Sequence, residues 1–186
     1  MLREMLERGE FAITCEFVPG RGKDGTTVDV VLNFARDVAK SGLKIHAVSL
    51  TDNPGGNPAI MPDALAPEIG KCGLEALVHF SCRDLNRNAA ESRVMALARA
   101  GVHNLLIVTG DYPASGFEGN ALGVFDLDSV QAVKYVKAMN AGLEVPGSKK
   151  GTFATLPRTN FLVGAAVSPF KLTEQELMTQ FFKLEK

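Results

Sequence analysis

The feature that most limits what this chain can fold into is a regular alternation of short apolar runs with longer helix-like segments. Five runs rich in apolar, β-branched or aromatic residues predict strands. They lie at residues 11–17, 45–51, 75–81, 104–109 and 161–166. Most of them are almost continuously apolar, which is typical of strands that a parallel sheet buries on both faces. The pattern therefore predicts a repeat of β-strand and α-helix.

Apolar residues at helical spacing fill the intervals between these runs. Five helices are expected, at residues 28–41, 64–71, 88–100, 127–141 and 172–186, after a short lead-in helix within residues 1–10. Pro67 makes the second of the five the least regular. The last begins with a capping box formed by Thr173 and Glu176, and it carries an apolar stripe from Leu177 to Phe182.

Two architectures satisfy this alternation, the (β/α) barrel and the open doubly wound sheet. The turn after the first strand lacks the G-x-G-x-x-G pattern of dinucleotide-binding open sheets, and polar residues follow several different strands, as in barrels. We therefore expect an incomplete (β/α)8 barrel of the TIM type, forming one partial domain over residues 1–186. A complete barrel needs about 250 residues. Since the sequence ends on a helix, we expect a fragment or one piece of a larger enzyme.

Composition argues against several classes of protein. The charges nearly balance, with 20 Lys and Arg against 21 Asp and Glu, and no run of like charge indicates a nucleic-acid surface. The 3 cysteines lack C-x-x-C spacing, so neither a disulfide framework nor a thiolate metal site is expected, and a cytoplasmic location fits. No stretch approaches the roughly 18 apolar residues of a membrane span. The amino terminus lacks the apolar run of a secretory signal.

Acidic residues stand where the first and fourth predicted strands end, the edge at which barrel enzymes bind their ligands. Glu16 lies between Cys15 and Phe17. Burial beside aromatic residues would suit it to act as a general acid near neutral pH. An ion pair with Arg21 or Arg83 is the alternative, and the residues alone do not decide between the two. Asp111 follows the fourth strand directly after a glycine.

The third predicted strand delivers His79 and Ser81, which share a face because strand side chains repeat every two residues. A histidine in such a run is either a hydrogen-bonded core residue or a ligand-binding group, and both interpretations stay open. Cys82 has no neighbouring base and is expected to be a buried thiol. The loops at residues 112–123 and 142–158 are long enough to be lids or mobile connections.

Several common catalytic motifs are absent from the sequence. It contains no H-E-x-x-H, Walker or G-x-S-x-G pattern, which argues against a zinc hydrolase, a P-loop ATPase and an elbow-type serine hydrolase. Acids, amides and small residues remain at the strand ends. Such a set suits a large organic cofactor better than a metal ion.

Five motifs in order resemble those of the methylenetetrahydrofolate reductase family. They are Cys15-Glu16-Phe17-Val18-Pro19, His79-Phe80-Ser81-Cys82-Arg83-Asp84, Thr109-Gly110-Asp111, Gly123-Val124-Phe125-Asp126-Leu127-Asp128-Ser129-Val130, and Val163-Gly164-Ala165-Ala166 followed by Pro169. The fourth motif resembles the subfamily whose reductase domain is larger or fused to a methyltransferase. The resemblance runs from the first predicted strand to the end of the chain. Thr179-Gln180 imitates the family's sixth-strand motif, but it falls within a predicted helix and is not counted.

This resemblance implies a flavin-dependent barrel that reduces 5,10-methylenetetrahydrofolate to 5-methyltetrahydrofolate, in one-carbon metabolism and methionine biosynthesis. It implies FAD as the cofactor and NAD(P)H, or another electron donor, as the reductant. It assigns Glu16 as the acid that protonates a folate nitrogen, and Asp111 as the group that orients the folate and stabilises developing positive charge. The residues that it places around the flavin are Thr51, His79, Ser81, Thr109, Gly110, Asp111 and Ala165, with Gln180, Lys183 and Lys186 at the outer part of the cofactor.

Two other functions remain open from the sequence. A folate-dependent methyltransferase barrel would bind a pterin without a flavin, and a noncatalytic piece would fold only with a partner chain. We expect a folate substrate and either a homo-oligomer or an electron-donating partner subunit, with neither nucleic acid nor membrane as a partner. Because the family's later strands are missing, the isolated chain is expected to be inactive.

Overall fold

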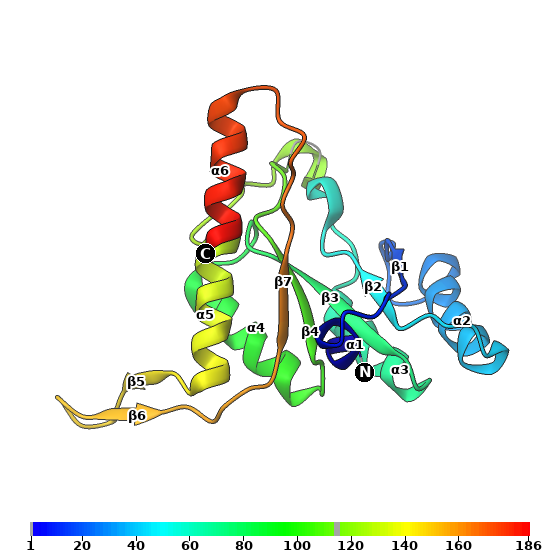
Figure 1. Ribbon diagram of the computed structural model, residues 1–186, viewed down its shortest axis with the longest axis horizontal. Helices are drawn as coiled ribbons and strands as arrows, with labels where there is room; N and C mark the ends of the chain where they lie inside the picture. Colours follow the sequence, from blue (N-terminus) through cyan, green and yellow to red (C-terminus); the bar gives the residue numbers. More distant parts are fainter. Residues whose placement is uncertain (1, 114–115) are drawn as a thin grey trace.

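The computed structural model describes residues 2–113 and 116–186, and a parallel sheet of five strands forms its centre (Figure 1). The strands are β1 (Thr14–Phe17), β2 (Ala47–Leu50), β3 (Glu75–Ser81), β4 (Asn104–Val108) and β7 (Leu162–Ala165). They lie side by side in the order β1-β2-β3-β4-β7, and every pairing is parallel. A doubly wound sheet reverses its strand order at a switch point, and this sheet does not. The topology is consistent with a section of a barrel.

Helices precede, connect and follow the strands. They are α1 (Leu2–Glu7), α2 (Thr26–Ser41), α3 (Pro62–Lys71), α4 (Arg87–Arg99), α5 (Ser129–Ala141) and α6 (Glu174–Glu185), with short 3-10 turns at Pro54–Gly56 and Gly116–Gly119. The predicted capping box at Thr173 and Glu176 is confirmed, and Asp128 with Gln131 forms a second one at α5. Over residues 2–113 and 116–186, no helix combines the length and the apolar character needed to cross a membrane.

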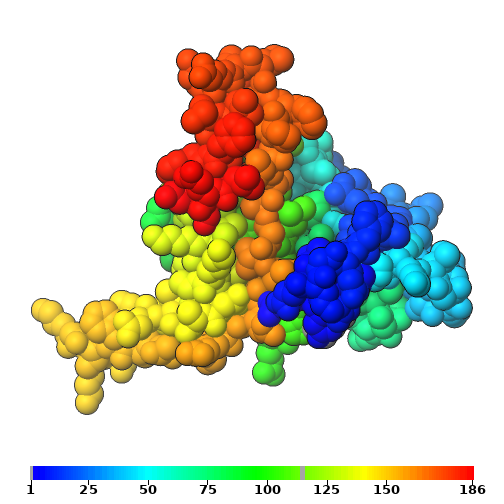
Figure 2. All heavy atoms as spheres, in the orientation of Figure 1, coloured from blue at the N-terminus to red at the C-terminus, as the bar shows by residue number. Residues whose placement is uncertain are grey.

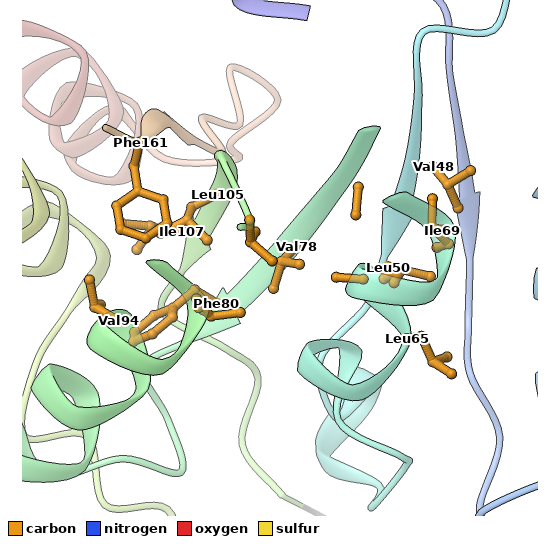
Figure 3. Packing of buried hydrophobic residues seen from close by; sticks show 14 of the residues in the cluster. Val48, Leu50, Leu65, Ile69, Val78, Phe80, Val94, Leu105, Ile107 and Phe161 are labelled. Carbon is orange, nitrogen blue, oxygen red and sulfur yellow. The ribbon is translucent and has the colours of Figure 1, made fainter. Parts of the chain in front are cut away.

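The helices α2 to α5 pack on one face of the sheet, and the core lies between the two layers (Figure 3). Val78, Phe80 and Ile107 point into this core and are at most 1% exposed. Along β3, Val78 and Phe80 alternate with Leu77 and His79, which face the other way and are only half-buried. The prediction that the strands are buried on both faces is confirmed for β2, whose four residues are all buried, and is wrong for β1, β3 and β7, whose residues on the other, open face are only half-buried or exposed.

The amino-terminal ends of the strands carry two further features. The backbone N–H of Leu2 donates to Glu75 Oε2 at 3.2 Å, so α1 lies at the start of β3. Within predicted loop 142–158, the short strands β5 (Glu144–Pro146) and β6 (Phe153–Thr155) form an antiparallel hairpin that projects from the body (Figure 2). Because it leads from the end of α5 to the start of β7, it lies away from the carboxyl strand ends. The prediction of a lid there is wrong.

Helix α6 differs from the other helices that follow strands. It stands beyond α5, next to the segment that continues from β7, and it does not lie on the sheet (Figure 1). None of its residues is buried, and Met178, Phe181 and Phe182 are exposed. The predicted apolar stripe exists, but it does not pack into the core.

Candidate active site

A cavity of about 570 Å³ opens at the carboxyl ends of the strands. Its walls come from the ends of β1, β3 and β4 and the loops after β2, β3 and β4 on one side, and from the β7–α6 segment on the other. The predicted site residues that line it are Glu16, Thr51, His79, Ser81, Thr109, Gly110, Asp111, Gln180 and Lys183. Residues far apart in the chain thus meet because parallel strands end at the same edge of the sheet.

Glu16 lies on the open face of the sheet, paired in register with Ser49 of β2. Its Oε2 atom is 3.6 Å from Nε2 of His79, and its side chain is 59% exposed. The predicted burial of Glu16 is wrong for the described chain, because β1 is an edge strand with only β2 beside it. The alternative ion pair is wrong as well. Arg21 donates to a backbone carbonyl, and Arg83 donates to Asp84.

His79 is largely enclosed on this open face, with its side chain 12% exposed. Its Nε2 atom lies 2.8 Å from Oγ of Ser49. Burial lowers the pKa of His79, while the negative charges of Glu16 and Asp52 act in the opposite direction. The imidazole is therefore mostly neutral at pH 7 and can either donate or accept through Nε2. The sequence analysis missed Ser49, although its spacing from Thr51 places both on one strand face.

Ser81 and Gly110 bring the ends of β3 and β4 close together. Ser81 is 1% exposed, and its hydroxyl has no hydrogen-bond partner within residues 2–113 and 116–186. Gly110 has a φ of 93°, and a Cβ atom there would lie 2.6 Å from Oγ of Ser81 and 2.8 Å from Cβ of Arg83. Only glycine fits this position without strain. Its backbone can therefore line the cavity directly.

Arg83, which the sequence analysis did not assign to the site, connects three loops beneath the cavity. It is 2% exposed. Its guanidinium donates to the carboxylate of Asp84, to the carbonyl of Asn53 at 2.9 Å and to the carbonyl of Asp111 at 3.1 Å. The hydrogen bond from Arg83 also lowers the pKa of Asp84. Because Asp111 is held through its backbone, its carboxylate stays available to a ligand.

A second buried cation supports the end of β3 from the helix side. Oδ2 of Asp52 accepts from the backbone N–H of Ser81 at 2.9 Å and also from Arg93 of α4. Arg93 in turn donates to Asp63 of α3, and it lies 4.9 Å from the ring centroid of Phe80. This network fixes the strand end that carries the cavity residues. Its partners are 29 to 41 residues apart, so no local pattern in the sequence shows them.

The β7–α6 segment supplies a polar and basic wall. Gln180 accepts from the backbone N–H of Ser168 at 3.1 Å, which fixes the loop, and Lys171 and Lys183 lie beside it. On the opposite wall, the hydroxyl of Thr109 donates to Ser129 at 3.1 Å and is thus engaged by the start of α5. The β7–α6 wall combines the positive charges of Lys171 and Lys183 with the amide of Gln180, as an anionic ligand requires.

Ala165 does not line the cavity, contrary to its predicted place beside the flavin. It pairs with Ile107 of β4, and the side chains of both point toward the helices. It lines a smaller hollow of about 200 Å³ between α5, β7 and α6, together with Lys186. Ala166, one residue later, lines the strand-end cavity instead. The difference arises because successive strand residues point to opposite faces.

Cys82 is 1% exposed and lies on the helix side of the sheet. Burial raises the pKa of its thiol to about 12. The thiolate is the reactive form of cysteine, so this group is inert at neutral pH. The prediction of a buried thiol is confirmed.

Fold and site together define a parallel βα-repeat protein with a cavity at the carboxyl ends of its strands. The model of one protein family, methylenetetrahydrofolate reductase, matches residues 1–146. The chain belongs to this family, and the match includes Glu16, His79 and Asp111. Membership indicates an oxidoreductase-like enzyme of folate and one-carbon metabolism. A comparison with curated proteins gives no match.

Proposed function

We propose that this protein acts in the flavin-dependent reduction of 5,10-methylenetetrahydrofolate to 5-methyltetrahydrofolate, on a (β/α)8 barrel. The observation that supports this best is the convergence of Glu16, His79 and Asp111 on one cavity. A proton donor, an imidazole and a second carboxylate at one site suit a reaction that protonates a nitrogen and develops positive charge. We further propose that the protein works in the cytoplasm, alone as a homo-oligomer or with an electron-donating subunit.

The residues of the cavity fit FAD. A volume of about 570 Å³ lies within the usual range for organic ligands. Lys171 and Lys183 would bind the phosphates, the backbone at Gly110 would face the ring, and the unpaired Ser81 hydroxyl stands beside it. When bound, FAD would supply the hydride, having taken it from NAD(P)H or another electron donor.

Glu16 is placed to act as the general acid. Its carboxyl group lines the cavity and is open to a ligand. Transfer of its proton to a bridging nitrogen of the folate opens the ring and leaves a cationic methylene group ready for reduction. Asp111, held through its carbonyl by Arg83, stabilises that charge and orients the pterin.

Replacement of Glu16 tests this function. In Glu16→Gln the amide keeps the shape but has no acid proton, so FAD affinity should change less than about twofold while folate reduction falls about 10²- to 10⁴-fold. FAD binding is measured by equilibrium titration, and turnover by the oxidation of reduced flavin with methylenetetrahydrofolate. Glu144→Gln on the β5–β6 hairpin is the matched control and should behave as the wild type.

Two results would contradict the proposal. If the purified protein does not bind FAD, the flavin-dependent reaction is wrong, and a flavin-free folate methyltransferase becomes the better hypothesis. If Glu16→Gln turns over as fast as the wild type, Glu16 is not the acid.

A further inference from the structure

We propose that Ser49 and His79 are a positioning pair for Glu16, in which the Ser49 hydroxyl fixes the imidazole and Nε2 of the imidazole holds the Glu16 carboxyl group. The inference rests on the proposed function, because it takes Glu16 as the acid. Its structural part concerns only side chains of this chain. It can therefore be tested without flavin or folate.

The three side chains come from three neighbouring strands. Glu16 of β1 and Ser49 of β2 are partners in register, and His79 of β3 lies on the same open face. Nε2 of His79 is 2.8 Å from Ser49 Oγ and 3.6 Å from Glu16 Oε2. Nε2 has one hydrogen-bonding position, so Ser49 Oγ makes the hydrogen bond and Glu16 Oε2 lies at the longer distance of a shared, three-centre contact.

Burial explains why Ser49 can fix the imidazole. Ser49 is 4% exposed, so water does not compete strongly for its hydroxyl. A buried hydrogen bond of this kind restricts the side-chain torsions of both partners. Glu16, in contrast, is an exposed side chain on an edge strand with several free torsions. The fixed imidazole gives this mobile carboxyl group one preferred position.

The pair can hold Glu16 in both of its charge states. The protonated carboxyl can donate to the Nε2 lone pair in place of the Ser49 hydroxyl, and the carboxylate left after proton transfer can share Nε2–H with Ser49 Oγ. The Ser49 hydroxyl rotates to donate or accept as each tautomer requires. The separation of 3.6 Å is long for a hydrogen bond, and catalytic contacts of this type commonly shorten once substrate is bound.

Charged groups reach His79 from several elements. Glu16 on β1 and Asp52 after β2 both favour the imidazolium, whereas burial favours the neutral ring. Asp111 after β4 and Lys183 on α6 line the same cavity. Of these, Glu16 contacts the ring, with Oε2 3.6 Å from Nε2. Removing it should therefore change the titration of His79 directly.

An NMR titration of the full chain without FAD or folate tests the pair. The sequence has 3 histidines, so the His79 signal can be assigned with His79→Gln. Glu16→Gln should lower the pKa of His79 by about 0.5 to 1, because it removes a carboxylate at close range. Glu144→Gln, the matched control, should leave that pKa unchanged. An equal response to the two substitutions would overturn the proposal.

The role of Ser49 is tested by repeating this titration in a protein that also carries Ser49→Ala. In Ser49→Ala the imidazole is no longer fixed, so Glu16→Gln should shift the pKa of His79 by less than half as much. If Ser49→Ala does not fold, Ser49→Cys keeps the side-chain size and replaces the hydroxyl with a weak hydrogen-bonding group. A shift of full size in the folded variant would show that Ser49 does not position the ring.

Activity distinguishes this inference from the function on which it rests. In an active enzyme, Ser49→Ala should lower kcat about tenfold with KM nearly unchanged. If the protein reduces folate but His79 does not respond to Glu16, the positioning pair is wrong and the function stands. If His79 responds but the protein binds no FAD, the function is wrong.

Discussion

The two faces of the central sheet differ, although the same strands form both. On the helix face, alternate residues such as Val78, Phe80 and Ile107 are apolar and buried. On the open face, Glu16, Ser49 and His79 are polar and interact with one another. Since a strand alternates its side chains, one face can supply stability while the other supplies chemistry. Substitutions on the two faces should therefore have separable effects.

The largest effect on stability is expected on the helix face. Phe80→Ala should lower the free energy of unfolding by about 3 to 5 kcal/mol, because it empties a core site and removes the ring beneath Arg93. His79→Ala, one residue away on the open face, should cost less than about 1.5 kcal/mol. Urea denaturation of both variants measures the difference. Equal losses would contradict the division between the faces.

The second largest loss of stability is expected from breaking the buried network of Arg93. Arg93→Met leaves Asp52 and Asp63 without their cation, so the expected loss is about 3 kcal/mol. Arg87→Met is the matched control in the same helix, because its ion pair with Asp126 is exposed and should contribute less than about 1 kcal/mol. If the two variants unfold at the same urea concentration, the network does not support the strand end.

A smaller effect is expected where the strand ends approach each other. Gly110→Ala should lower the free energy of unfolding by about 2 kcal/mol. The new Cβ would clash with Ser81 and Arg83, and alanine is strained at a positive φ. Gly101→Ala has a similar φ of 77° but no atom within 4 Å of the new Cβ, and it should cost about 1 kcal/mol. Thermal unfolding separates them. A greater loss for Gly101→Ala would show that close packing at Gly110 is unimportant.

The smallest effect concerns pH. Since the folded-state pKa of His79 is lowered, the unfolded chain takes up a proton more readily below pH 6.5. This contribution to stability is thus full above about pH 6.5 and is lost as the pH falls toward the folded-state value. His79→Gln should therefore lose less stability than the wild type between pH 7.5 and 5.5, as measured by urea denaturation. The same loss in both proteins would contradict the assigned burial of His79.

Much of the fold could be predicted, because the βα alternation is regular and the strands are apolar. The limits of β3 agree with those predicted, and all the predicted helices are present. The β5–β6 hairpin could not be predicted, since strands of three residues are too short to show a period and their side chains are mostly exposed. The location of the site at the carboxyl ends followed from parallel topology, and most of its residues followed from the family resemblance.

The details of the site depend on contacts that the sequence does not encode locally. Ala165 and Ala166 exchange roles because a shift of one residue in a strand reverses the face. Glu16 is exposed because β1 is an edge strand with a neighbour on one side only. The partners of Arg83 come from three separate loops. Such facts require the tertiary structure.

A crystal structure of the protein grown with FAD tests the central claim most directly. The account predicts that the flavin ring lies in the cavity at the carboxyl ends of the strands, between Glu16, His79 and Asp111, with its phosphates toward Lys171 and Lys183. A flavin bound at any other surface, with this cavity filled by solvent, would contradict it.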